Sequence, residues 1–198
     1  IYDSNKYNFM KQVKDGTIGE EVYKCFRKRI GEVSPSEKLA WRNSLRNMYS
    51  VLNNKLIPDD VGVFIEYRLP YQNRRIDFIV SGKNLDDSEH AVIVELKQWT
   101  EAKAIEHKHL VKTFVGHADR EVSHPSYQAW SYAATLNEYN QVVQEDNIEL
   151  HPCAFLHNYV VIDEEDPIVD ANLFEEINQA PIFTRDDTKK LSDSVASF

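Results

Sequence analysis

The sequence predicts an α/β fold in which a long helix, a three-stranded antiparallel meander, a second helix and a further strand follow one another. Three observations support this prediction: apolar residues at helical spacing up to Pro58, three strand-like runs separated by turn-rich segments, and a helical segment followed by an apolar run. The expected elements are a helix over 34–57, strands over 61–69, 75–81 and 90–99, a helix over 124–144, and a strand over 150–162.

The predicted core comprises residues 34–162, and its first helix has sequence signals for a start and a stop at its two ends. Ser34 and Pro35 supply a capping residue and a first-turn proline, and Glu37 adds an early carboxylate. Apolar residues then recur at helical spacing until Pro58 closes the helix. The segment therefore predicts a long amphipathic helix.

The three strand-like runs predict an antiparallel meander. The first two are joined across 70–73, and the last two across 82–89. Residues 100–123 form a mixed stretch in which 110–115 has the pattern of a further strand. The second helix then begins at His124, which is followed by a proline.

Before this core, residues 1–33 predict an N-terminal helical cover. Two short helices are expected over 5–14 and 17–29, on either side of Asp15 and Gly16.

After the core, residues 163–198 form an acidic extension that is expected to add peripheral elements. Its last part has the pattern of a starting helix, with Thr184 or Asp186 near the cap. Because the chain begins with Ile1 and stops inside this segment, we expect it to be a piece of a longer protein.

Composition predicts one ordinary globular domain. A chain of 198 residues suits a single domain with a sizeable core. No run of about 18 apolar residues and no secretory signal occurs, so we expect a cytoplasmic protein without a membrane span. Cys25 and Cys153 are too few and too far apart for a disulfide framework or a cysteine-based zinc site, so both are expected to be small buried hydrophobes.

The net charge of −9 is unusual for a protein that approaches a polyanion, because Lys and Arg usually neutralise phosphate in such complexes. The acidic residues are unevenly distributed. From 145 to the end there are 13 acidic and three basic residues, which leaves 19 acidic and 20 basic residues in the first 144. Tight binding of nucleic acid is therefore expected to need another domain or partner.

Asp77, Glu95 and Lys97 lie within strongly apolar strands. Alternation places Asp77 on the same strand face as Arg75 and Ile79. Glu95 and Lys97 share one face of the next strand, whose apolar run indicates burial on both sides. Burying charges without partners costs several kcal/mol, so these residues need a physical explanation.

Two explanations compete for these charges. One is a structural ion pair within the core. The other is a metal site in which Asp77 and Glu95 hold Mg²⁺ or Mn²⁺, while Lys97 orients an attacking water or stabilises charge that develops on a phosphate. The second arrangement contains the parts that phosphodiester hydrolysis needs.

Asp77 followed by Glu95-x-Lys97, on consecutive strands between two helices, resembles the active-site motif of the PD-(D/E)XK nuclease superfamily. In the following helix, Gln128 and Tyr132 resemble the QxxxY motif of its RecB-like branch, and their spacing puts them on one helix face. The resemblance implies a restriction-endonuclease-like core and a Mg²⁺- or Mn²⁺-dependent nuclease. It also implies that Gln128 and Tyr132 orient the lysine or contact phosphate; routine helix packing is the alternative.

The superfamily often adds an acid from its first core helix. The resemblance assigns this catalytic role to Glu37, with Glu20 and Glu21 as substitutes, and a capping or dipole role for Glu37 stands equally. The family pattern has a proline-like turn before its first aspartate, whereas Ile76 precedes Asp77 here. That position varies in such families.

Other side chains near the motif are candidates for binding the substrate backbone. His124 is expected mainly to begin the helix. Because it lies just before Gln128, contact with phosphate is its second predicted role. His107, His109 and His117, with His124, match no standard zinc spacing, so no zinc cluster is expected there. The basic candidates, for which a solvated surface is the alternative, are Arg74, Arg75, Lys103, Lys108, Lys112 and Arg120.

More narrowly, several phrases resemble the N-terminal nuclease region of bacterial and phage proteins that carry a superfamily-one, Schlafen-like helicase. These phrases are SEKLAWRNSL, RRIDFIV, VIVELKQW, REVSHPSYQAWSY and PCAFLHNYV. The resemblance implies a helicase domain after this chain and a role in DNA processing or phage defence. The chain has no phosphate-loop motif, so ATP hydrolysis is not expected of this piece.

The sequence thus leaves three hypotheses. The first is a metal-dependent nuclease domain, with DNA favoured over RNA as the substrate. The second is a catalytically inactive module of the same fold that binds nucleic acid or a partner for an attached helicase, which the acidic composition favours. The third is a structural domain whose three charged residues form a buried ion network.

Overall fold

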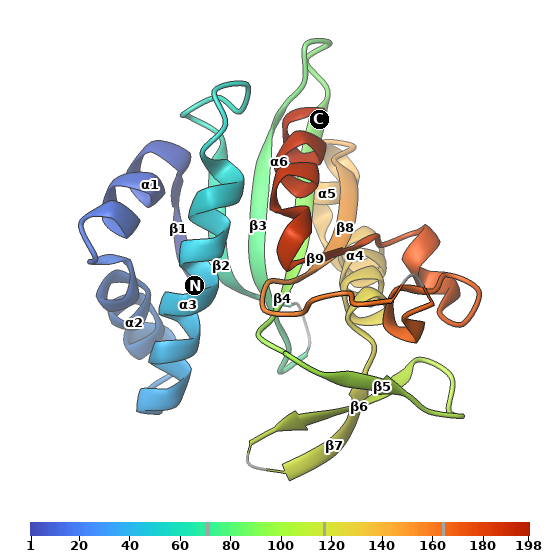
Figure 1. Cartoon of the computed structure of the whole chain (residues 1–198). Helices are drawn as coiled ribbons and strands as arrows, with labels where there is room; N and C mark the ends of the chain where they lie inside the picture. Colours follow the sequence, from blue (N-terminus) through green and yellow to red (C-terminus); the bar gives the residue numbers. More distant parts are fainter. Residues whose placement is uncertain (70–71, 117, 164) are drawn as a thin grey trace.

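Residues 1–69, 72–116, 118–163 and 165–198 are described by the computed structural model of the chain. A six-stranded sheet with both parallel and antiparallel pairs lies between helices (Figure 1), so the predicted α/β class is confirmed. A second sheet, of three strands, lies at one end of the large one (Figure 1). The predicted link over 70–73 lies partly outside the described residues.

The large sheet has the strand order β1-β2-β3-β4-β8-β9. Its strands are β1 (Tyr2–Asn5), β2 (Gly62–Arg68), β3 (Arg75–Lys83), β4 (Glu89–Lys97), β8 (Glu149–Leu156) and β9 (Ile182–Thr184). Neighbours from β1 to β4 pair antiparallel, whereas β8 pairs parallel with both β4 and β9. The predicted meander is therefore present as β2, β3 and β4.

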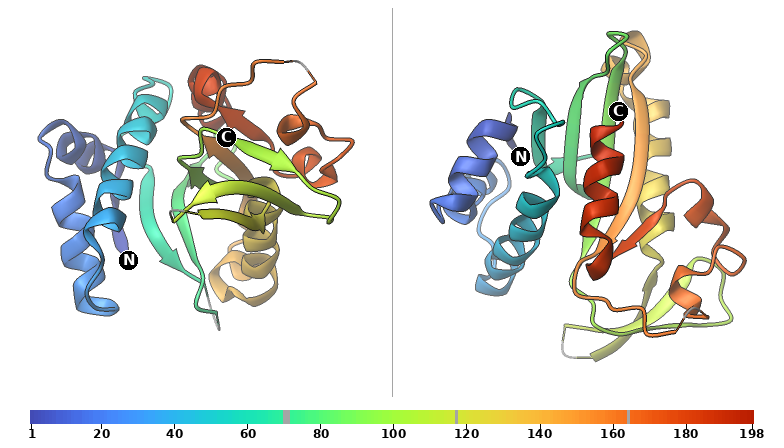
Figure 2. Two further views of the ribbon diagram at one scale, coloured as in Figure 1. Left: turned by 60° about the horizontal axis from the view of Figure 1, so that its bottom comes forward. Right: turned by 45° about the horizontal axis from the view of Figure 1, so that its top comes forward.

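Helices cover both faces of the large sheet (Figure 2). Both faces are therefore buried, and the side chains on both are apolar. On one face, Phe78 and Val94 belong to the main core cluster. On the other, Ile79 and Ile93 pack with Leu136. The first face carries α1 (Lys6–Lys14), α2 (Ile18–Arg29), α3 (Pro35–Leu52) and α6 (Thr188–Ala196), and the second carries α4 (Pro125–Tyr139) and α5 (Gln141–Glu145).

The two predicted N-terminal helices are confirmed as α1 and α2. Gly16, between them, has a φ of +72°, in the left-handed region that favours glycine. Phe9 and Val22 are fully buried in the main core cluster, so this segment contributes to the core as well as covering it. The short strand β1, which precedes α1, is not indicated by the sequence pattern.

Polar side chains set the ends of the two long helices. The hydroxyl of Ser34 accepts the backbone N–H of Glu37 at the start of α3, as predicted. This helix ends at Leu52 rather than near Pro58. The predicted helix over 124–144 is divided because the Asn140 side chain accepts two backbone N–H groups and caps α5.

The predicted last strand of the core is too long. β8 ends at Leu156 rather than at 162, because the chain turns at His157 and Asn158. The Tyr159 N–H closes this turn by donating to the Leu156 carbonyl. After this turn, Tyr159 and Ile168 pack in one cluster with Val111 of the small sheet, and the chain returns to the large sheet at β9.

The expectation that 163–198 is peripheral is wrong. Its strand β9 extends the large sheet, and Leu191 of α6 is fully buried in the main core cluster. Thr184 and Asp187 form a capping box before α6, which agrees with the predicted cap at Thr184. The described part of the extension, 163 and 165–198, also contains the short 3₁₀ helices η1 (Pro167–Val169), η2 (Glu175–Asn178) and η3 (Arg185–Asp187).

The smaller sheet consists of β5 (Ala102–Ala104), β6 (Leu110–Val115) and β7 (Ala118–Ser123), of which only β6 is predicted. Val111 is fully buried in a cluster that includes Trp99 and Ile168. Phe114, on the same strand as Val111, is 64% exposed. The sheet therefore packs one face against the body of the protein and leaves the other exposed.

The two cysteines differ in their burial. Cys153 is buried, as expected, whereas Cys25 is only partly buried, and both are free thiols. Within the part of the chain that the structure describes, no helix is both long enough and apolar enough to cross a bilayer.

We predict that Phe78→Ala destabilises the fold by about 3–5 kcal/mol, because it leaves a cavity at a fully buried position. The Phe78 ring also makes an edge-to-face contact with Phe9, with 5.3 Å between ring centroids. Urea unfolding followed by circular dichroism measures the change. The matched control, Phe114→Ala, removes an exposed ring and should change stability by less than about 0.5 kcal/mol. Equal losses in both variants would contradict this assignment of the core.

Candidate active site

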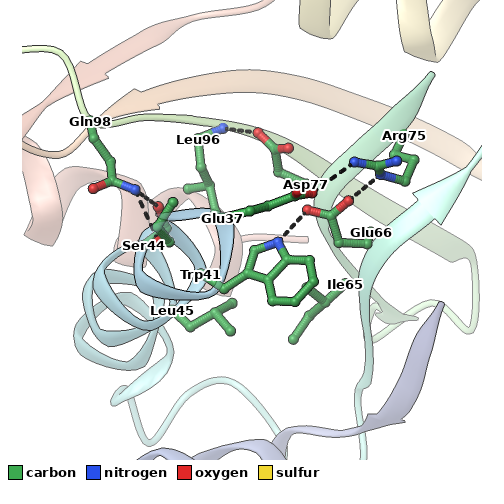
Figure 3. Close-up of a pocket in the computed structure, with 11 residues that line it drawn as sticks. Glu37, Trp41, Ser44, Leu45, Ile65, Glu66, Arg75, Asp77, Leu96 and Gln98 are labelled. Atoms are coloured by element: carbon green, nitrogen blue, oxygen red, sulfur yellow. Dashed lines mark hydrogen bonds and ion pairs between the residues drawn. The ribbon is translucent and has the colours of Figure 1, made fainter. Parts of the chain in front are cut away.

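Asp77 lies where β3 and β4 separate. The ladder between the two strands ends at the pair of Phe78 and Val94, although β4 continues to Lys97 in its pairing with β8. Beyond that end, the backbone N–H of Leu96 donates to Oδ2 of Asp77 at 2.8 Å (Figure 3). The aspartate is therefore fixed at the fork between two strands of an apolar sheet.

Glu95 and Lys97 meet at this fork. The Lys97 ammonium donates to Oε1 of Glu95 at 2.5 Å. Glu95 is only 1% exposed, and its other oxygen, Oε2, has no hydrogen-bond partner among the described residues. The Lys97 side chain is 18% exposed, so one end of this pair reaches solvent.

The following helix adds two polar residues to the pair. Oε1 of Gln128 accepts a hydrogen bond from Lys97 at 3.1 Å, and Nε2 of Gln128 donates to the Tyr132 hydroxyl at 2.6 Å. Ala129, between them in the sequence, is fully buried, which lets α4 approach the sheet. The spacing of four thus brings both residues to the face that holds the lysine, as predicted.

The ionisable groups at the fork have shifted pKa values. Burial, followed by repulsion from Glu95, raises the pKa of Asp77 well above its usual range. Burial also raises the pKa of Glu95, although attraction to Lys97 opposes the shift. Burial acts to lower the pKa of Lys97, but attraction to Glu95 and Asp77 outweighs it and raises this pKa. The fork therefore favours a charged lysine and disfavours two charged carboxylates.

A cavity of about 270 Å³ opens beside Asp77, between the start of β3 and α3 (Figure 3). The amide of Gln98, at the end of β4, donates to the Ala40 carbonyl and to the Ser44 hydroxyl and so ties the strand end to the helix. The polar or charged residues of the lining are Glu37, Trp41, Ser44, Glu66, Arg75, Asp77 and Gln98. Carboxylates from three elements thus face one cavity.

Glu66, which was not predicted from the sequence, also faces the cavity and is 7% exposed. Its carboxylate pairs with the Arg75 guanidinium and accepts the indole N–H of Trp41 at 2.7 Å (Figure 3). Its φ of +56° lies in the left-handed region, so these contacts hold a conformation that is unfavourable for glutamate. Its charge adds to the rise in the Asp77 pKa. The available signal was a lone carboxylate in an apolar strand, the same signal that singled out Asp77.

The acids proposed for the first helix lie in different places. Glu37 lines the cavity and pairs with Arg75 at 3.2 Å. Glu20 pairs with Arg42, Glu21 pairs with a lysine of its own helix, and neither lines the cavity. Of the three, the structure brings only Glu37 to the site.

Two predicted substrate contacts have different surroundings from those expected. Arg75, expected to bind phosphate, has its guanidinium between the carboxylates of Glu37 and Glu66. His124 is fully buried, accepts the Ser126 N–H through Nδ1, and bonds the carbonyl of Ile168 through Nε2. Its prediction as a phosphate contact is therefore wrong because it has no exposed surface, while its role in starting α4 is confirmed.

The remaining basic candidates do not line the cavity. Lys103, Lys112 and Arg120 belong to the small sheet and are exposed. Lys108 is in an exposed turn, and Arg74 is exposed just before β3. His117 lies outside the described residues. None of these five basic side chains is part of the cavity lining.

The fork has the donors that a hard divalent cation needs. Mg²⁺ prefers carboxylate oxygens and keeps several waters. The unpaired Oε2 of Glu95 is a buried acceptor that a cation would satisfy, and Asp77 presents a second carboxylate to the adjoining cavity. The residues present therefore fit a Mg²⁺ or Mn²⁺ site at Asp77 and Glu95.

Comparison of the chain with protein-family models, curated proteins and solved structures gives no match. What the site can do therefore has to follow from its own residues and geometry.

We predict that Asp77→Asn raises the melting temperature at neutral pH in the absence of divalent cations. Because the folded chain raises the pKa of Asp77, the wild type loses stability as pH rises from the unfolded pKa through the folded pKa. Asparagine keeps an acceptor for the Leu96 N–H and does not ionise. The gain should largely disappear at about pH 4, near the unperturbed aspartate pKa.

Differential scanning fluorimetry at both pH values measures this effect. Asp86→Asn, which neutralises an exposed carboxylate between β3 and β4, is the matched control and should have little effect at either pH. A gain for Asp77→Asn that is the same at both pH values would contradict the electrostatic explanation.

Proposed function

We propose that this chain is a metal-dependent nuclease domain that hydrolyses phosphodiester bonds. The observation that carries the proposal is a carboxylate pair at a strand fork, formed by the buried Glu95 and the half-buried Asp77, with Lys97 bonded to Glu95. The order of helix, meander, helix and strand supports a restriction-endonuclease-like core for the same residues.

The balance of charge favours a metal site over a structural ion pair. A buried ion pair needs one acid for each base, and an extra buried carboxylate is costly. The fork and its cavity bring together four carboxylates, of Glu37, Glu66, Asp77 and Glu95, but only two cationic groups, of Arg75 and Lys97. When all are ionised, two negative charges remain, which one divalent cation would neutralise.

The residues of the site have separable roles in this proposal. Bound Mg²⁺ would supply positive charge for the phosphate and lower the pKa of a water. Glu95 and Gln128 accept hydrogen bonds from Lys97 and fix the direction of its ammonium. An ammonium has three N–H bonds, so Lys97 retains one to orient the attacking water or to stabilise a phosphate oxygen. Tyr132 holds the Gln128 amide and thus acts through it.

DNA is the favoured substrate, in the setting of a cytoplasmic nuclease-helicase protein. This part of the proposal rests on the sequence phrases that resemble such fusions and on the acidic composition, which favours help from a nucleic-acid-binding partner. Arg75 would act indirectly, because it orients Glu37 and Glu66 at the cavity wall instead of being free to bind phosphate.

An inactive binding module is the second candidate. Two observations favour it: Lys97 and Glu95 already neutralise one another, and the net charge of −9 opposes unaided binding of a polyanion. Such a module would bind nucleic acid or a partner without metal-dependent cleavage.

We predict that the chain cleaves nucleic acid only with Mg²⁺ or Mn²⁺, and that Lys97→Ala lowers the rate on the order of 10²–10³-fold, as loss of a charge-stabilising donor does in other enzymes. The assay incubates labelled single- and double-stranded DNA and RNA with each cation. Lys83→Ala, which removes an exposed lysine from the neighbouring strand, is the matched control and should retain the rate.

Circular dichroism and the melting temperature establish that each variant folds. Asp77→Asn provides a second variant, in which the stabilisation by Mg²⁺ or Mn²⁺ should also be lost. Wild-type binding of nucleic acid without cleavage under every condition would favour the inactive module instead. Cleavage that survives both substitutions would reject the site.

A further inference from the structure

A second group of possible metal ligands lies at the opposite end of β4. His90, near the start of β4, is paired in register with Glu149 at the start of β8. His151 is two residues further along β8, so it lies on the same side of that strand as Glu149. The parallel pairing of β4 with β8 therefore brings together two imidazoles and one carboxylate that are some 60 residues apart in the chain.

The potential ligand atoms of these three residues converge. Nδ1 of His90 is 2.9 Å from Nε2 of His151, and these nitrogens are 3.8 and 3.9 Å, respectively, from oxygens of Glu149. Two ligands bound to Zn²⁺ at about 2.1 Å with a tetrahedral angle are about 3.4 Å apart. The observed separations lie on both sides of that value, so small side-chain movements bring all three groups to binding distance.

The surroundings hold the two imidazoles in place. His90 is 9% exposed, and the Phe198 ring stacks on His151 with 3.6 Å between ring centroids. The Glu149 side chain is 67% exposed, which leaves one side of the group open to solvent. One buried and one partly buried imidazole beside an accessible carboxylate provide an ion with both a fixed anchor and a path of entry.

A hydrogen bond between the two histidines is the competing explanation. It uses Nδ1 of His90 and Nε2 of His151, the same two nitrogens that lie nearest the Glu149 oxygens. It gives no role to Glu149, although the carboxylate lies near both rings. The bond alone therefore does not account for the whole group.

We propose that His90, Glu149 and His151 bind a divalent transition-metal ion, for which Zn²⁺ is the appropriate probe. Imidazole nitrogen with one carboxylate is a donor set that Zn²⁺ accepts and that Mg²⁺ does not favour. Three protein ligands leave a fourth position for water on the open side. The ion would hold the first residues of β8 to β4.

This site is separate from the proposed nuclease site. Lys97 is seven residues further along β4 than His90, which corresponds to about 23 Å along an extended strand. The two sites use opposite ends of the strand and different donor atoms. The Zn²⁺ proposal therefore does not depend on the proposed nuclease function.

Calorimetric titration of the 198-residue chain with Zn²⁺ tests this proposal. The titration uses an Asp77→Asn background, so that the carboxylate site does not take up the probe. We expect one Zn²⁺ per chain and a higher melting temperature in its presence. Glu149→Gln, which changes an exposed side chain, should weaken binding at least tenfold, about the least that loss of an outer-shell partner costs.

His151→Gln should abolish this binding, whereas the control His107→Gln, at an exposed turn, should leave it unchanged. Absorption bands of bound Co²⁺ in the visible range should appear in the control and not in His151→Gln. Absence of Zn²⁺ binding, or binding that Glu149→Gln and His151→Gln leave intact, would overturn the proposal. Circular dichroism of each variant distinguishes loss of the site from loss of the fold.

Discussion

The structure depends most on how the chain accommodates two carboxylates and an ammonium inside an apolar sheet. Glu95 is almost fully buried, yet only one of its oxygens has a partner among the described residues. Asp77 is close enough for each acid to affect the charge of the other. Lys97 compensates one acid, and the second requires either a proton or a cation. This unequal pairing makes the fork a candidate reaction site.

The scaffold keeps this fork rigid from both sides. On one face, α4 brings Gln128 to the lysine, and its small residues pack directly on the sheet. On the other face, Trp41 of α3 fixes Glu66, and Gln98 joins the end of β4 to the same helix. The extension after β8 completes the layer by adding a strand and the buried face of α6. Elements from the whole chain therefore limit how far the strands can separate.

Local patterns in the sequence were sufficient to predict that Asp77, Glu95 and Lys97 lie on neighbouring strands. A period of two places Asp77 on one face of its strand and Glu95 with Lys97 on one face of the next strand. The antiparallel ladder ends at Phe78 and Val94, so the next residues, Asp77 and Glu95, lie at the same end of it. Glu66 was not predicted as a site residue because its position depends on a tryptophan 25 residues earlier and on a left-handed backbone conformation. The short strands β1 and β9 have four and three residues, too few to show a period. His124 was wrongly predicted as a phosphate contact because the ring that stacks on it, Phe174, comes from a distant segment of the chain.

The two ends of β4 differ in the cations that they can hold, and the cause is the donor atoms that the neighbouring strands present. At the end beside β3, the donors are carboxylate oxygens in a buried fork, which suit a hard cation that retains water. At the end beside the start of β8, two imidazoles are held by stacking and a carboxylate faces solvent, which suits a softer ion. Because β4 pairs antiparallel with β3 and parallel with β8, one strand positions both groups while keeping them far apart. Under the two proposals, different metals would bind to one sheet without competing for ligands.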